Sequence, residues 1–383
     1  MGSPAQVLLI LLLLVPTVPA ALAQPMRLEP VTVARGLVHP WGLAFLPDGR
    51  MLVTERPGRM RLVGRDGALG APIAGLPPVV ASGQGGLLDV ALDPKFADNA
   101  LVYWTFSEPA ADGKDGNSTA AARGRLEGNR LVDVEVVFRQ QPKVASTLHF
   151  GSRLAFARDG TLYIGLGDRF TRKDDAQTLD THHGKVVRIE PDGRVPADNP
   201  FVGRADALPE IWSYGHRNIQ GAAIDPATGA LWIVEHGPQG GDELNRVGRG
   251  ANHGWPVITH GRNYVTGTKI GEGTERADVV PPVKVWVPVS IAPSGMAFVT
   301  SDRYPGWKGS VLVGALRGQQ LVRLELDGNR VVREETLLAD LNERIRDVRQ
   351  APDGWIYLLT DSGKLIQIRS VRTLSPAYLL LFD

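Results

Sequence analysis

A hairpin motif that recurs six times is the feature of this 383-residue chain that most limits its fold. Each copy has a small or apolar start, an alternating hydrophobic run, a turn built mostly on Pro, Asp and Gly, and a second hydrophobic run. Such runs on either side of turn residues predict two antiparallel strands. The copies are residues 42–54, 88–105, 153–165, 222–234, 295–314 and 348–360.

The spacing of these copies predicts a six-bladed β-propeller. Roughly 45 to 75 residues separate successive copies, which leaves room for one four-stranded antiparallel blade with its loops. We therefore expect an all-β propeller over residues 24–370, closed by an outer strand from residues 26–34 or from residues 364–368. No segment has a sustained helical period, which disfavours folds that alternate strands with helices. A β-sandwich with ordinary turns is the alternative.

The two ends of the chain differ in character from the repeats. An unbroken apolar run from Val7 to Val15 and small residues up to Ala23 predict a signal peptide over residues 1–23. The run is short for a membrane span, so we expect no stable membrane insertion after cleavage, although an uncleaved anchor is the alternative. The absence of cysteine excludes disulfides and is compatible with a periplasmic location. Residues 371–383 form an apolar tail of unassigned role.

The charge balance excludes one class of partner. The chain has 42 Lys and Arg against 41 Asp and Glu, and the basic residues are scattered rather than clustered. Without a basic excess there is little to neutralise phosphates, so nucleic acid is not an expected partner.

One histidine and one aspartate flank the third hairpin. His149 precedes its first strand and Asp168 follows its second strand. If both ends face the central channel, the two side chains come together, and a carboxylate beside an imidazole suits a general base. The alternative is a histidine packed at a strand end and an aspartate that closes a turn.

Arginines recur in separate loops between the hairpins. Arg217 and Asn218 precede the fourth hairpin, and Arg344 and Arg346 open the sixth on one face of an extended segment. Together with Arg317 they would suit an anionic ligand with several carboxylates. Taken singly, each is as well explained as a solvated loop or strand edge.

Two glycine-rich segments are further candidates. Residues 235–243 are acidic and expose backbone carbonyls, as a hard cation such as Ca²⁺ requires, but their spacing is not that of an EF-hand. Gln84 precedes the second hairpin in the position that His149 has before the third, beside glycines that permit close approach to a ligand. An ordinary flexible turn is the alternative for both segments.

Taken together, these segments resemble the glucose/sorbosone dehydrogenase family, in particular its soluble aldose sugar dehydrogenases that use pyrroloquinoline quinone. The resemblance runs from about His39 to Asp361. Several segments in the family's order are more specific than any single one. They are residues 83–89, 149–168, 214–218, 235–245, 252–256 and 344–347.

The resemblance implies a role for each candidate in the oxidation of the C1 hydroxyl of aldoses to lactones. His149 would be the general base during hydride transfer to the quinone, oriented by Asp168, with Arg217 near the quinone carbonyl. The implied cofactor contacts are Gln84, Arg217, Asn218, Thr259, Tyr264, Arg317, Arg344 and Arg346. Gly237 and Pro238 would offer carbonyls to a catalytic Ca²⁺, and Glu243 with the backbone near His253 would hold a second, structural Ca²⁺.

Three functions remain in view at this point. The first is this quinoprotein dehydrogenase, with an aldose substrate, an unidentified electron acceptor and a monomeric or homodimeric state. The second is a calcium-dependent lactonase or esterase on a propeller, which would use acidic and Asn metal ligands in the channel. The third is a non-catalytic binding propeller, which would have no need of His149 or Asp168.

Overall fold

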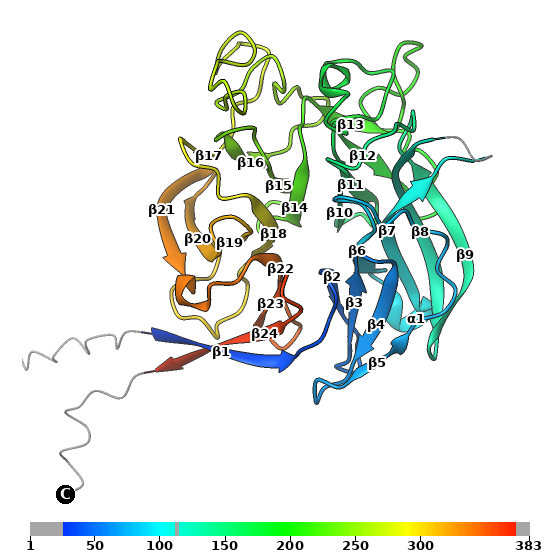
Figure 1. Cartoon of the computed structure of the whole chain (residues 1–383), viewed down its shortest axis with the longest axis vertical. Coiled ribbons are helices and arrows are strands. Elements are labelled where there is room, and N and C mark those ends of the chain that lie inside the picture. Colours follow the sequence, from blue (N-terminus) through cyan, green and yellow to red (C-terminus); the bar gives the residue numbers. More distant parts are fainter. Residues whose placement is uncertain (1–25, 112–114, 373–383) are drawn as a thin grey trace, which may run out of the picture.

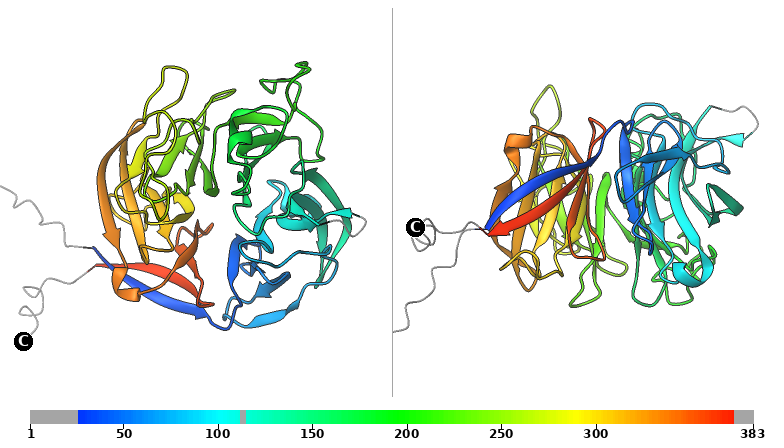
Figure 2. Two further views of the ribbon diagram at one scale, coloured as in Figure 1. Left: turned by 45° about the horizontal axis from the view of Figure 1, so that its top comes forward. Right: turned by 90° about the horizontal axis from the view of Figure 1, so that it is seen from below.

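The computed structural model describes residues 26–111 and 115–372, and these residues form a six-bladed β-propeller of four-stranded antiparallel sheets. Figures 1 and 2 show the blades arranged around a central axis. The predicted fold class is confirmed, and the β-sandwich alternative is excluded. The predicted signal peptide and all but the first two residues of the predicted tail lie outside the described residues.

The blades follow one another along the chain. The first three consist of β2 (Pro40–Phe45), β3 (Met51–Glu55), β4 (Arg59–Val63) and β5 (Leu69–Pro72); β6 (Leu87–Leu92), β7 (Leu101–Pro109), β8 (Asn117–Glu127) and β9 (Arg130–Arg139); and β10 (Gly151–Phe156), β11 (Leu162–Leu166), β12 (Lys185–Ile189) and β13 (Ile211–Tyr214). The last three consist of β14 (Ile219–Ile224), β15 (Leu231–Glu235), β16 (Asp242–Arg246) and β17 (Lys284–Trp286); β18 (Pro293–Phe298), β19 (Val311–Ala315), β20 (Gln320–Asp327) and β21 (Arg330–Leu337); and β22 (Ile345–Gln350), β23 (Ile356–Thr360), β24 (Leu365–Arg372) and β1 (Met26–Ala34).

Each predicted hairpin is the pair of innermost strands of one blade. The hairpin of residues 42–54, for example, corresponds to β2 and β3, in which Gly42 pairs with Thr54 and Phe45 with Met51. The helical elements include α1 (Phe96–Asn99) and short 3₁₀ turns at Lys173–Gln177 and Ala339–Leu341.

The N-terminal strand closes the ring. β1 is the outermost strand of the last blade and pairs antiparallel with β24, from Met26 opposite Arg372 to Thr32 opposite Ile366. In Figure 2 the blue β1 lies beside the red β24. Of the two segments predicted to close the ring, residues 26–34 therefore supply the outer strand, while residues 364–368 overlap the strand next to it.

The hydrophobic core is divided among the contacts between blades. Each of the six large clusters combines residues of two neighbouring blades. One contains Trp104 of the second blade with Leu52 of the first, and another joins Leu359 of the last blade to Val53 of the first. Because both faces of a blade are covered, inner strands such as β3 are apolar along much of their length rather than strictly alternating.

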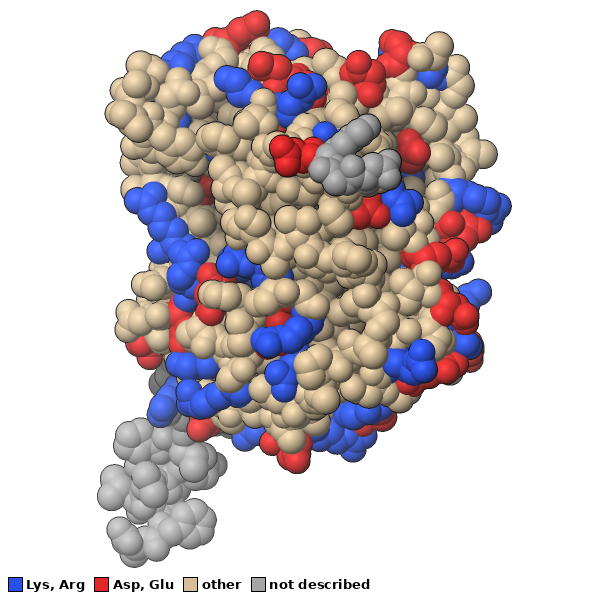
Figure 3. Space-filling model, turned by 45° about the vertical axis from the view of Figure 1, so that its right-hand side comes forward, with Lys and Arg blue, Asp and Glu red and all other residues tan. Residues whose placement is uncertain are grey.

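The face of the molecule drawn in Figure 3 carries charged side chains of both signs. Basic and acidic side chains are interspersed over the face shown in Figure 3, consistent with the formal net charge of +1. Among the residues that the structure describes, no helix is long and apolar enough to cross a membrane.

Candidate active site

One end of the ring carries most of the predicted site residues. Two kinds of connection meet there: those that lead into an innermost strand, and the turns between the second and third strands of a blade. Neighbouring strands are antiparallel, so the start of the first strand and the end of the second lie at the same end. His149 before β10 and Asp168 after β11 therefore meet, as predicted, with Nδ1 and Oδ1 2.7 Å apart.

The contact with Asp168 fixes which nitrogen of His149 is available. An ionised carboxylate can only accept a hydrogen bond, so Nδ1 carries the proton and Nε2 keeps its lone pair. His149 lines a cavity, whereas the Asp168 side chain is 1% exposed behind it. The pair thus presents a basic nitrogen to the cavity and keeps the negative charge away from solvent.

Burial and hydrogen bonding set the ionisation of this pair. Burial lowers the pKa of His149 more than its hydrogen bond to Asp168 raises it. Burial also opposes ionisation of Asp168, but the hydrogen bond from His149 and the charge of Arg217 outweigh it and hold the pKa of this carboxyl below its usual range. Both shifts favour a neutral imidazole beside an ionised carboxylate, which is the form that can accept a proton.

The backbone around the pair is held in an uncommon conformation. His149, Arg169 and Phe170 all have positive φ, at 51°, 57° and 64°. The His149 N–H donates to Gln84 Oε1 at 2.8 Å, and the buried Arg169 guanidinium donates to the Leu148 carbonyl at 3.1 Å. Positive φ at non-glycine residues costs free energy and persists where the surroundings enforce it, often at functional sites.

Two adjoining cavities lie on the axis beside this pair. Their volumes are about 480 and 410 Å³, and both are lined by Gln84, His236 and Ala292. The larger is lined also by Asn218, Arg344 and Arg346, and the smaller by His149, Arg217, Gly237, Pro238, Tyr264 and Arg317. Most of the residues predicted to contact a cofactor therefore line one or the other of two neighbouring cavities.

The larger cavity has an excess of positive charge. Arg344 and Arg346 converge on Asp361, with each Nε 3.0–3.1 Å from one of its oxygens, and Arg56 lies on the same wall. Burial opposes ionisation of Asp361, but the two arginines lower its pKa below the usual range, so it is ionised. Three guanidinium groups face one carboxylate, and such a cavity favours an anionic ligand.

Arg217 lies in the wall of the smaller cavity and is held there by several hydrogen bonds. The backbone N–H of Arg217 donates to the buried Glu235 carboxylate. The side-chain Nη1 donates to the carbonyls of His236 and Gly237 at 3.0 and 2.5 Å. Its Nε is buried without a hydrogen-bond partner among the described residues. Tyr264 lies beside it, with its hydroxyl 3.4 Å from Nη2.

Three predicted site residues lie apart from these cavities. Thr259 lines neither cavity within the described chain, because its hydroxyl turns back to accept the N–H of Gly261 at 3.2 Å. Glu243 and His253 line a separate cavity of about 500 Å³. The cofactor contact that the resemblance implies for Thr259 stays a prediction.

The separate cavity has polar groups that suit a cation. Burial and the nearby charge of Glu235 raise the pKa of Glu243 to about 8. Asn245 Oδ1 and His253 Nδ1 are buried without hydrogen-bond partners in the part of the chain described. No cluster of three or more His, Asp or Glu side chains there could hold a metal by itself. A hard cation would therefore need backbone carbonyls and water besides Glu243.

The structure also identifies site residues that the sequence pattern did not single out. The Trp255 Nε1–H donates to Asp168 Oδ2 at 2.7 Å, and the Arg217 guanidinium lies 5.2 Å from the Trp255 ring centroid. Trp255 thus contacts both the carboxylate and the guanidinium of the site. Its place in residues 252–256 was the sequence signal for it, while Arg56 and Asp361 had none beyond their position near strand ends.

Comparisons with known proteins identify the family. The model of the Glucose / Sorbosone dehydrogenase family matches residues 37–367, so the chain belongs to this family. It is 46% identical to the aldose sugar dehydrogenase YliI of Escherichia coli over 339 residues, which cover 87% of this chain and 90% of that protein.

Solved structures agree with this assignment. The apo form of the soluble aldose sugar dehydrogenase of Escherichia coli has a TM-score of 0.86 and 42% identity, covering 91% of this chain and all of that one. The PQQ-bound aldose sugar dehydrogenase of Streptomyces coelicolor has a TM-score of 0.73 and 31% identity, with 91% and 100% coverage. The chain is therefore an oxidoreductase of the sugar dehydrogenase type.

The hydrogen bond from Trp255 leads to a prediction about sugar oxidation. Trp255→Phe removes the donor to Asp168 Oδ2 and keeps most of the ring, so we expect kcat to fall about ten- to hundredfold. Without this donor the carboxylate is more basic and the pair binds a proton more readily. The acid limb of the kcat/KM profile should therefore move to higher pH, as steady-state assays across pH would show.

A matched control is available in the fourth blade, whose β16–β17 connection carries Trp255. Trp286 Nε1 in β17 donates at 3.0 Å to Glu334 in β21 of the fifth blade. Trp286→Phe should leave the pH profile unchanged. An unchanged pH profile in Trp255→Phe would show that Trp255 does not act on the pair.

Proposed function

We propose that this protein is a quinoprotein that oxidises the C1 hydroxyl of aldose sugars to lactones with pyrroloquinoline quinone. The single observation that carries the proposal is the arginine-lined cavity directly beside the His149–Asp168 pair. The PQQ-bound form of the Streptomyces coelicolor relative supports the choice of cofactor.

The cavity residues fit this cofactor. Pyrroloquinoline quinone is a flat tricarboxylate, so its recognition requires several cations and a planar space. Arg344, Arg346 and Arg56 would pair with carboxylates of the cofactor in the larger cavity. Arg317 would contribute a further positive charge from the smaller cavity. Asn218 from the larger cavity and the Arg217 guanidinium from the smaller one would contact the quinone ring.

The residues of the pair supply the proton chemistry. When bound, the quinone supplies an acceptor for the hydride that leaves C1. His149 Nε2 takes the proton of the C1 hydroxyl, and Asp168 stabilises the imidazolium that forms. Loss of one hydride and one proton converts the cyclic hemiacetal to the lactone. Arg217 provides positive charge beside His149 where negative charge develops.

Calcium is proposed at two places. At the first, the carbonyls of Gly237 and Pro238 would hold a Ca²⁺ that polarises the quinone. In this structure the Gly237 carbonyl oxygen accepts a hydrogen bond from the Arg217 guanidinium. The Ca²⁺ would therefore compete with this guanidinium for the same oxygen. At the second, Glu243 would hold a structural Ca²⁺ with the backbone near His253.

The second calcium site leads to a stability prediction. At millimolar Ca²⁺ we expect the Tm to rise by about 5 °C, because an ion that binds the folded state stabilises it, and EGTA should reverse the rise. Glu243→Gln should reduce this response to the part that the first site contributes, while Glu127→Gln at the exposed end of β8 should retain all of it. Differential scanning calorimetry with and without Ca²⁺ measures the effect. An intact response in Glu243→Gln would remove Glu243 from the site.

We also propose that the mature protein is periplasmic. The proposal rests on the apolar run and small-residue stretch of residues 1–23 and on the absence of cysteine. An electron acceptor in the same compartment would reoxidise the cofactor.

The proposed reaction is tested by dye reduction with the purified mature protein. We expect activity with glucose and other aldoses only when both pyrroloquinoline quinone and Ca²⁺ have been added. An absorbance titration reports quinone binding independently of turnover. No activity together with no quinone binding would overturn the dehydrogenase proposal.

The role of His149 has its own test. His149→Ala should bind the quinone with a Kd within about threefold of the wild-type value, because the arginines are unchanged, while kcat falls roughly 10²- to 10⁴-fold. Absorbance titration and steady-state assays separate the two quantities. Near-normal kcat would exclude His149 as the base.

The lactonase alternative is less well supported by the geometry. A channel calcium site would need carboxylates free to coordinate a metal, but the channel carboxylates Asp89 and Asp347 are both paired with arginines. A binding propeller would not require the low pKa values of both members of the His149–Asp168 pair.

A further inference from the structure

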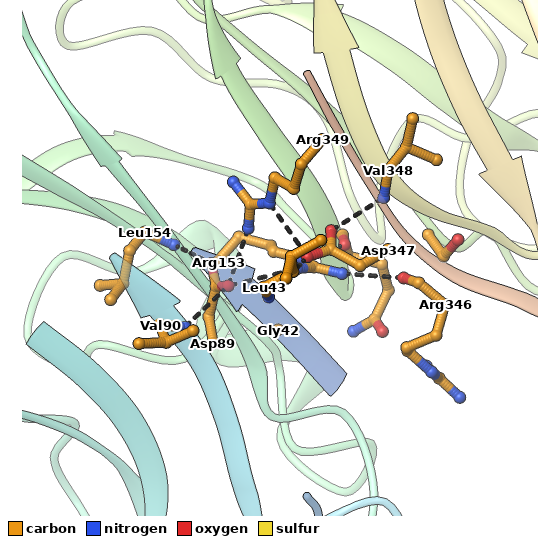
Figure 4. Close-up of polar contacts among 12 residues, drawn as sticks. Gly42, Leu43, Asp89, Val90, Arg153, Leu154, Arg346, Asp347, Val348 and Arg349 are labelled. Carbon is orange, nitrogen blue, oxygen red and sulfur yellow. Dashed lines mark hydrogen bonds and ion pairs between the residues drawn. The ribbon is translucent and has the colours of Figure 1, made fainter. Parts of the chain in front are cut away.

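Four charged side chains meet on the axis below the larger cavity. They are Asp89 from β6, Arg153 from β10, and Asp347 and Arg349 from β22, and we call them the channel cluster. Figure 4 shows them pointing toward one another. Three of the side chains are at most 2% exposed, and Arg349 is 22% exposed.

The cluster is neutral and internally paired. Arg153 Nη1 lies 3.3 Å from Asp89 Oδ1 and 3.0 Å from Asp347 Oδ1. Arg349 donates to the same two carboxylates, from Nη2 to Asp89 at 2.8 Å and from Nε to Asp347 at 2.9 Å. Each carboxylate is therefore shared by both guanidinium groups, which compensates the cost of burying the charges.

The cluster also satisfies backbone groups on the inner edges of the blades. The N–H groups of Leu43 in β2 and Leu154 in β10 donate to Asp347 and Asp89 at 3.1 and 2.9 Å. Arg153 donates to the carbonyls of Gln220 in β14 and Arg346 in β22. An innermost strand has one unpaired edge, and its buried polar groups need such partners.

Two glycines make room for the cluster. A Cβ at Gly42 of β2 would lie 2.9 Å from Asp89 Oδ1, and a Cβ at Gly295 of β18 would collide with Asp347 Oδ1. With these two strands, the innermost strands of all six blades meet the cluster.

Arg153 is the member that reaches the cofactor cavity. Its guanidinium carbon lies 4.1 Å from the ring centroid of Trp41, and Trp41, Gln220 and Arg346 all line that cavity. Trp41 forms a small apolar cluster with Leu88 and Phe150, which line the same wall. On the opposite side, Arg349 lines hollows of about 500 and 400 Å³ at the other end of the channel.

We propose that Arg153 is a positioning residue that fixes the Trp41 ring and the Arg346 backbone at the floor of the cofactor cavity, within a cluster that closes the channel. The inference rests on the proposed function, because the cavity's ligand is taken to be the quinone. Arg153 itself touches neither quinone nor sugar in this role. It acts through the Trp41 ring and through Arg346, both of which line the cavity.

The test uses Arg153→Lys. Lysine keeps the charge but cannot contact two carboxylates, two carbonyls and an aromatic face at once. We expect the quinone Kd, measured by absorbance titration without sugar, to rise roughly 3- to 30-fold. The acid limb of the kcat/KM profile should stay in place, because the His149–Asp168 pair is untouched.

Arg323→Lys is the matched control. Arg323 in the fifth blade makes the same kinds of contact: Glu335, the Gly306 carbonyl and the Trp307 ring. Arg323→Lys should lower the Tm by about as much as Arg153→Lys does. Its Kd for the quinone should equal that of the wild-type protein. An unchanged Kd in Arg153→Lys, or equal weakening in both variants, would overturn the positioning role.

Two further measurements keep the outcomes distinct. If wild-type protein fails to bind the quinone, the proposed function fails rather than this inference. If Arg153→Lys does not fold, the double variant Arg153→Met with Asp89→Asn removes one charge of each sign and leaves the Asp347–Arg349 pair intact. The same rise in Kd is expected for the double variant, and a wild-type Kd would overturn the inference.

Discussion

The free inner edges of the innermost strands are the constraint on which this propeller depends. Every blade brings one unpaired strand edge to the axis, where little solvent is available to satisfy it. Near the middle of the axis, Asp89 and Asp347 accept backbone N–H groups while Arg153 donates to carbonyls. Ionised side chains suit this position because each of them can form hydrogen bonds with several strands at once. Toward the active end, the same axis widens into the cofactor cavity.

The chemistry of the site follows from this arrangement. Strands hold the frame, while the connections at one end supply side chains from different blades. His149, Asp168 and Trp255 come from three separate connections, yet they form one chain of hydrogen bonds. Burial lowers the pKa of His149, whereas hydrogen bonds and nearby positive charge lower the pKa of Asp168 against the effect of burial.

Much of this could be predicted from the sequence, for identifiable reasons. The hairpins have local signals, namely alternation and turn residues, and strand direction alone brings His149 to Asp168. The contact of Trp255 could not be predicted in the same way, because Asp168 lies 87 residues away in another blade and the intervening loops have no regular period. Thr259 remains a predicted cofactor contact, and in the structure its hydroxyl accepts the N–H of Gly261.

The position of β1 has a consequence for how the protein is made. The last blade needs residues 26–34 and residues 365–372, so its sheet is incomplete until nearly the whole chain has been synthesised. Contacts between such distant segments form late, because the entropy of closing the intervening loop must first be overcome. The emerging polypeptide therefore stays an open arc of blades, and only the final stretch converts it into a ring.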